Sequence, residues 1–105
     1  ENEKNKDKQE IPSIKADVEG RTYKIQVYAS KFPAAKDAKV YQDFKVVSIE
    51  QAANGVYRHM VNEYASYNEA SADLVNVVIK GYRGAYIVAY KDGQRVQVYD
   101  ITTTN

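Results

Sequence analysis

The chain has 105 residues, which is enough for one domain with a modest hydrophobic core. It contains no cysteine, which excludes disulfides and thiolate metal sites, and its 15 Lys and Arg residues against 14 Asp and Glu give a formal net charge of +1. That balance argues against a dedicated nucleic-acid binder, and no apolar run is long enough to span a membrane.

The N-terminal segment is expected to be a linker. Residues 1–10 are mostly charged and include no aliphatic side chain, so burial cannot offset the entropy cost of ordering them. We predict a charged, flexible linker over residues 1–20, a folded domain over 21–101 and a frayed tail over 102–105. Because the sequence does not begin with Met, we also expect that an N-terminal targeting or anchoring segment has been removed.

The first half of the domain begins with an alternating strand over residues 23–30. Its two sides differ in polarity, with Tyr23, Ile25 and Val27 on one and Gln26 and Tyr28 on the other. Pro33 ends this strand, and a short helix is predicted over 34–44. A second strand follows over 45–52, and Asn54-Gly55 predicts a type I′ turn into a third strand over 56–62.

The second half of the domain begins with a stronger helix. Ser66 and Glu69 have the spacing of a capping box, and Gly81 is a suitable residue to follow the helix C-terminus. A fourth strand is predicted over 85–90. Asp92-Gly93 then predicts a second hairpin turn into a short fifth strand over 94–101.

This order predicts an α+β fold of the ferredoxin-like βαββαβ type, with a short extra C-terminal strand. Right-handed crossovers would give a four-stranded antiparallel sheet with both helices on one face. The first and third strands would be central and adjacent, and the fourth would lie beside the first. The other sheet face would be uncovered.

A repeated motif marks the two central strands. The segment that starts Tyr23-Lys24 is echoed by the one that starts Tyr57-Arg58. Strand parity sends one set of side chains to the core, namely Tyr23, Ile25, Val27, Tyr57, His59 and Val61. It sends a second set to the uncovered face, namely Gln26, Tyr28, Arg58 and Met60, with Tyr86 beside them. Polar and tyrosine side chains in one cluster are suited to hydrogen-bonding sugar hydroxyls and stacking on sugar rings.

An enzymatic role is not expected. His59 is the one histidine, and its strand position predicts a packed, hydrogen-bonded side chain on the core face. No spacing places a nucleophile next to an oriented base, and no second histidine or cysteine could complete a metal site. We predict no catalytic residue, no metal and no cofactor.

RNA binding is a distant alternative. Residues 83–90 loosely resemble the RNA-recognition signature, and the predicted fold is also that of RNA-recognition modules. The signature, however, belongs on the third strand of such modules and falls here on the fourth. Ala85 and Ile87 occupy the places that should stack on bases. No nucleic-acid partner is therefore expected.

The domain resembles the SPOR (sporulation-related repeat) family over residues 22–95. Residues 23–27 are similar to the family's opening aromatic-x-Val-Gln-Val strand, and residues 56–64 to its second half. Residues 81–93 are similar to its closing pattern. The sequence is most similar to family members from Bacteroidetes. The chain departs from the family pattern at two places. Asn62 stands where the family has glycine, and Ser30 matches the motif serine only if the alignment is shifted by one residue.

The resemblance implies a non-catalytic module of the periplasm or cell envelope that binds peptidoglycan glycan strands. It implies a preference for septal strands stripped of stem peptides, with division or wall-remodelling proteins as possible further partners. Strand parity and the resemblance together predict the binding residues Gln26, Tyr28, Ser30, Arg58, Met60 and Tyr86 on the uncovered sheet face. The alternative is a protein-interaction domain of the same fold, using the tyrosine-rich face or the edge of the last strand.

Overall fold

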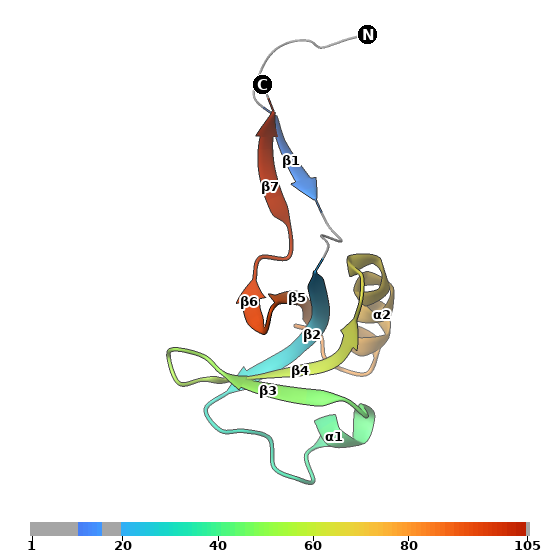
Figure 1. Cartoon of the computed structure of the whole chain (residues 1–105). Helices are drawn as coiled ribbons and strands as arrows, with labels where there is room; N and C mark the ends of the chain where they lie inside the picture. The colour runs from blue at the N-terminus through green and yellow to red at the C-terminus, as the bar shows by residue number, and fades with distance from the viewer. Residues whose placement is uncertain (1–10, 16–19, 105) are drawn as a thin grey trace.

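The computed structural model describes residues 11–15 and 20–104; residues 1–10, 16–19 and 105, and the side chains of 11–15 and 100–104, lie outside the description. Seven strands and two helices occur in the described ranges (Figure 1). They are β1 (Ile11–Lys15), β2 (Arg21–Ser30), α1 (Lys39–Asp43), β3 (Val47–Gln51), β4 (Tyr57–Tyr64), α2 (Tyr67–Ile79), β5 (Tyr86–Lys91), β6 (Gln94–Val96) and β7 (Asp100–Thr104).

The main sheet has five antiparallel strands in the order β3-β4-β2-β5-β6. The α+β class is confirmed. The predicted neighbours are also confirmed, because β2 and β4 are adjacent, β5 lies beside β2, and β3 lies beside β4. β6 is the fifth strand, and it is shorter than the predicted one, which ran from 94 to 101.

Both helices contribute to one core against one face of this sheet, which we call the helix face. Packing requires an apolar stripe on α2, and Ala70 and Val77 supply its buried positions. The larger buried cluster consists of Ile25, Val27, Val40, Phe44, Val61 and Val77, and a second one consists of Tyr23, Ala70 and Ala89. Each fully buried aliphatic side chain stabilises the fold by about 1.5–3 kcal/mol.

The two predicted hairpins differ in turn type. At Asp92-Gly93 both residues have positive φ, 53° and 78°, as the predicted type I′ turn requires. At Asn54-Gly55 only the glycine does, with φ 89°, so the type I′ prediction is wrong there. Ala52 instead closes a three-residue loop, because its N–H donates to Val56 O at 2.8 Å and its carbonyl accepts from Gly55 N at 2.8 Å.

The two helices differ in how well the sequence predicted them. α2 has the predicted cap, since Ser66 Oγ accepts from Glu69 N at 3.1 Å. Gly81 follows the helix with φ 113°, as expected. The first helix was predicted over 34–44 but begins only at Lys39. The preceding chain is engaged elsewhere, because the Ala34 N–H donates to His59 Nε2 at 3.0 Å.

A second, two-stranded sheet joins the two ends of the described chain. β1 pairs antiparallel with β7, from Ile11 opposite Thr104 to Lys15 opposite Asp100. This ribbon extends away from the five-stranded sheet (Figure 1). It occupies part of the predicted linker and the start of the predicted tail; the rest of the linker prediction, over 1–10 and 16–19, lies outside the described residues, as does residue 105 of the tail.

Candidate functional site

A bulge in β2 decides which side chains reach the sheet face opposite the helices, which we call the groove face. Gln26 pairs with Met60, but Tyr28 pairs with His59, so Val27 is an extra residue in the ladder. An extra residue reverses the alternation of side chains beyond it. Gln26 therefore lies on the groove face, whereas Val27 and Tyr28 both lie on the helix face, in or against the core cluster.

This bulge corrects two of the predicted site positions. Tyr28 does not lie beside Gln26; its ring stacks on His59, with centroids 4.3 Å apart. Ser30 pairs with Tyr57 on the helix side, and its hydroxyl donates to Phe32 O at 2.6 Å. Strict alternation, without the bulge, was the reason for the wrong placement of Tyr28. The core position predicted for His59 is confirmed, since its side chain is fully buried and accepts the Ala34 N–H.

A second irregularity lies where β4 leaves the central ladder. Tyr23 pairs with Tyr64, but Ile25 pairs with Val61, so β4 has an extra residue between them. Asn62 adopts φ 62° in this segment, a left-handed conformation that favours glycine or asparagine. Its side-chain amide donates to Tyr64 Oη at 3.0 Å and to Asp73 Oδ2 at 3.3 Å, which ties the bulge to α2.

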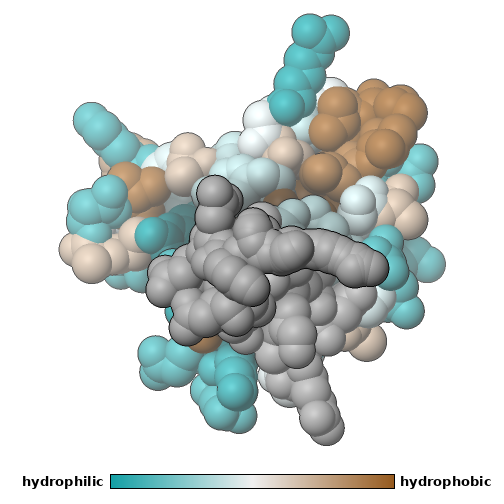
Figure 2. All heavy atoms as spheres, turned by 90° about the horizontal axis from the view of Figure 1, so that it is seen from above, coloured by the Kyte–Doolittle hydropathy of each residue, from teal (hydrophilic) through white to brown (hydrophobic). Residues whose placement is uncertain are grey.

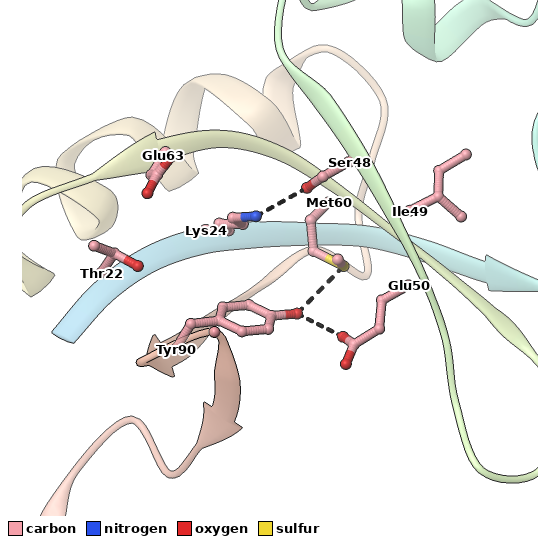
Figure 3. A pocket seen from close by; sticks show the side chains of 9 residues that line it. Thr22, Lys24, Ser48, Ile49, Glu50, Met60, Glu63 and Tyr90 are labelled. Atoms are coloured by element: carbon pink, nitrogen blue, oxygen red, sulfur yellow. Dashed lines mark hydrogen bonds between the residues drawn. The ribbon is translucent and has the colours of Figure 1, made fainter.

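The sheet curls, and side chains of strands that are not neighbours meet on the groove face. β3 and β5 are separated by β4 and β2, roughly 14 Å on a flat sheet with strands about 4.8 Å apart. Yet Tyr90 of β5 donates its hydroxyl proton to Glu50 Oε1 of β3 at 2.6 Å (Figure 3). The curled sheet encloses a pocket of about 370 Å³. It is lined by Thr22, Lys24, Ser48, Ile49, Glu50, Met60, Glu63, Tyr90 and Gly93.

Three side chains cross the groove face and form what we call the clasp: Glu50, Tyr90 and Arg95. Arg95 comes from β6, and its Nη1 lies 3.6 Å from Glu50 Oε1. Its Nη2 donates to Gln26 Oε1 at 2.9 Å. Arg58 of β4 approaches the same Glu50 oxygen at 3.9 Å. The clasp therefore connects β3 with β5 and β6 through side chains alone.

The clasp covers the centre of the face that was expected to be open. Met60, Val88 and Gln26 are only 2%, 3% and 6% exposed, although no helix lies over them. The expectation of an uncovered face is wrong at these positions. Gln26 in particular accepts a hydrogen bond from Arg95, so its carbonyl oxygen holds the clasp in place.

The pocket is lined by one cation, Lys24, and two carboxylates, Glu50 and Glu63, and two arginines approach Glu50 from outside this lining. Lys24 Nζ donates to Ser48 Oγ at 3.2 Å and lies 5.1 Å from the centre of the Tyr90 ring (Figure 3). Burial raises the pKa of Tyr90 to about 12, and the hydrogen bond to Glu50 acts in the same direction. Tyr90 is therefore a neutral hydrogen-bond donor at physiological pH.

The structure brings together four of the six predicted site residues. Gln26, Arg58, Met60 and Tyr86 lie on the groove face, as the strand pairing of β2, β4 and β5 requires. Glu50, Tyr90 and Arg95 also lie there, but they were not among the predicted site residues. The alternation from Tyr86 could have found Tyr90, and the Asp92-Gly93 turn places Arg95 directly opposite it. Glu50 carried no such signal, because its approach depends on the curl of the sheet.

Exposed apolar side chains occur elsewhere on the described surface. Apolar surface gathers on one side of the molecule (Figure 2). On α2, Val75 and Ile79 are 60% and 75% exposed and lie four residues apart. Among the described residues no group of His, Asp and Glu is arranged to hold a metal ion. No helix in the described ranges has the length and apolar character of a membrane span.

Comparison with protein-family models, with curated proteins and with solved structures found no match for this chain.

Proposed function

We propose that this chain is a SPOR-like, non-catalytic module of the bacterial cell envelope or periplasm that binds peptidoglycan glycan strands in the groove. The observation that carries the proposal is the pocket of about 370 Å³ on the sheet face opposite the helices, lined by Tyr90, by polar and charged side chains and by the apolar Ile49 and Met60. Sugar-binding sites require dispersed hydrogen-bonding groups next to an aromatic ring, and these residues supply both.

Two features of the backbone support the resemblance. The order β3-β4-β2-β5, with both helices packed on one face, is compatible with a ferredoxin-like arrangement, to which β6 is added. Asn62 stands where the family has glycine, and it adopts the left-handed conformation that glycine would favour.

The binding residues we propose differ from the initial set. Arg58, with a side chain 34% exposed, is placed to donate charge-assisted hydrogen bonds to a glycan. Tyr86, 49% exposed, offers a ring for stacking on a sugar face. Gln26 and Met60 form the floor and position the residues above them. Tyr28 and Ser30 lie on the helix side and are not included.

The test is a pull-down with purified sacculi, before and after an amidase has removed the stem peptides. The variant Arg58→Ala with Tyr86→Ala should lose about tenfold or more in binding, because it removes one charged donor and one stacking ring. The matched control is Arg83→Ala with Tyr41→Ala, which removes the same residue types from exposed positions in the loop between α2 and β5 and in α1. Equal retention of the two variants would rule out this face, and equal binding before and after digestion would rule out a preference for stripped strands.

A protein-interaction domain is the second candidate. The exposed pair Val75 and Ile79 on α2 favours it, because solvent-facing apolar side chains of a helix are typical of contact surfaces. Failure of the native protein to bind sacculi in either form would favour this candidate over glycan binding.

A further inference from the structure

Two guanidinium groups from different strands share one carboxylate in the groove. Arg95 Nη1 and Arg58 Nη1 lie 3.6 and 3.9 Å from Glu50 Oε1, beyond the distance of a good N–H···O hydrogen bond. The same oxygen already accepts the Tyr90 hydroxyl at 2.6 Å. Glu50 therefore neutralises part of the local charge, but it leaves the guanidinium donors incompletely satisfied.

The guanidinium of Arg95 is held in a defined orientation, and one of its two terminal nitrogens lacks a hydrogen-bond acceptor. Gln26, 6% exposed, fixes Nη2 through its amide oxygen at 2.9 Å. Nη1 is buried and has no hydrogen-bond partner among the described residues. A buried donor without an acceptor is unfavourable, whereas a guanidinium that is already oriented suits a carboxylate well.

The Glu50 carboxylate, which lies near both Arg95 and Arg58, can rotate away from them. Glu50 belongs to the edge strand β3, and its side chain is 36% exposed. Rotation toward solvent would free the position of its carboxylate without disturbing the ladder. Glu50 also lines the pocket, together with Lys24, which adds positive charge, and Glu63, the other acidic lining residue.

We propose that Arg95 and Arg58 form a carboxylate-binding subsite of the groove, in which the acid group of an acidic sugar replaces Glu50. This inference rests on the proposed glycan-binding function and names its ligand class: glycan strands with free carboxylates on their sugars. Hydrolysis of the amide bond that links a stem peptide to the glycan leaves one such carboxylate. The subsite therefore supplies a physical reason for a preference for stripped strands.

The test compares two forms of one ligand on the native protein. Soluble amidase-treated glycan strands carry a fluorescent label, and half are treated with a carbodiimide and ammonia to convert each free carboxylate into a neutral carboxamide. Fluorescence anisotropy at low ionic strength gives the affinity of the 105-residue chain for each form. We expect the amidated strands to bind about tenfold more weakly, the usual effect of losing a charged hydrogen-bond partner.

Three variants sharpen the assignment. Arg95→Gln should narrow the difference in affinity between the two forms, because the oriented guanidinium is lost and only Arg58 of the pair remains. Glu50→Gln should bind the acidic form more tightly than the native protein does, since the internal competitor has lost its charge. Arg83→Gln, the matched control from an exposed loop, should keep the native ratio.

The outcomes separate the subsite from the function. If the native protein binds the acidic and amidated strands equally, the carboxylate subsite is wrong and glycan binding still stands. If it binds neither, both proposals are wrong. If circular dichroism shows that Arg95→Gln does not fold, the native comparison and Glu50→Gln still decide the question.

Discussion

The two faces of the sheet are buried to the same depth by different means. On the helix face, Ile25 and Val61 are fully buried beneath α1 and α2 in an apolar cluster. On the groove face, Met60 and Val88 are 2% and 3% exposed, yet polar side chains of the clasp lie over that face instead of a helix. Depth of burial alone therefore does not distinguish a face covered by helices from one covered by side chains. A helix is fixed by its backbone, whereas a clasp of side chains can rotate open.

The largest expected effect comes from truncating one buried side chain on each face. Ile25→Ala should lower the free energy of unfolding by about 4 kcal/mol, because the cavity lies between rigid elements and cannot collapse. Met60→Ala should cost about 2 kcal/mol, at the lower end for such changes, because the clasp can move inward. Urea denaturation measures both values.

Ile79→Ala is the control for this pair, since Ile79 is 75% exposed and should change stability by less than about 0.5 kcal/mol. If Met60→Ala costs as much as Ile25→Ala, the two faces are equally rigid and the comparison fails.

Most of the fold could be predicted from local sequence signals. Alternation located β2, β4 and β5, the capping box located α2, and Asp92-Gly93 determined the turn before β6. The start of the first helix was predicted wrongly. Its alanines favour a helix, but the tertiary hydrogen bond from Ala34 N to His59 Nε2 keeps the beginning of that segment from being helical.

The site was harder to predict than the fold. Parity correctly placed Gln26, Arg58, Met60 and Tyr86 on one face. Parity placed Tyr28 on the wrong face, because β2 has a bulge at Val27. The residues before and after the bulge all suit a strand, so the sequence does not show where the bulge lies. The clasp depends on the curl of the whole sheet, which brings Glu50 to Tyr90 across two strands. Single-residue patterns carry no information on that distance.

The second-largest effect is a pH dependence of the free energy of unfolding, which we expect from His59 on the helix face. Burial lowers the pKa of His59 below its usual 6.5, so the folded protein keeps the ring neutral where the unfolded chain takes up a proton. This stability is fully present above about pH 6.5 and is lost as the pH falls toward the lower folded pKa. With one proton involved, the slope cannot exceed about 1.4 kcal/mol per pH unit.

His59 is the one histidine in the chain, which makes the assignment testable. Urea denaturation from about pH 7.5 down to about pH 5.5 should show a falling free energy of unfolding for the native protein and none for His59→Gln. The lowered pKa values of Asp43 and Asp73 act only at more acidic pH, so they do not interfere. The same slope in both proteins would mean that another group is responsible.

The smallest effect on stability is expected from a change in the clasp. Its main consequence should be a shift in the pKa of Tyr90. Glu50→Gln should lower the pKa of Tyr90 from about 12, because the negative charge that opposes tyrosinate is gone while Arg58 and Arg95 remain nearby. Burial, the largest cause of the raised pKa, stays in the variant. Stability at neutral pH should change by less than about 1 kcal/mol, as is usual for partly exposed ion pairs.

Tyrosines elsewhere in the molecule provide the internal control for this titration. Tyr64 and Tyr82 also have pKa values of about 12, but burial and the carboxylates of Asp73 and Asp43 raise them. NMR titration of ¹³Cζ-labelled tyrosine should therefore show a shift at Tyr90 alone in Glu50→Gln. A shift at all three would indicate a general loosening of the fold. An unchanged Tyr90 would mean that Glu50 does not close the groove in solution, and the contrast between a helix-covered face and a clasped one would then disappear.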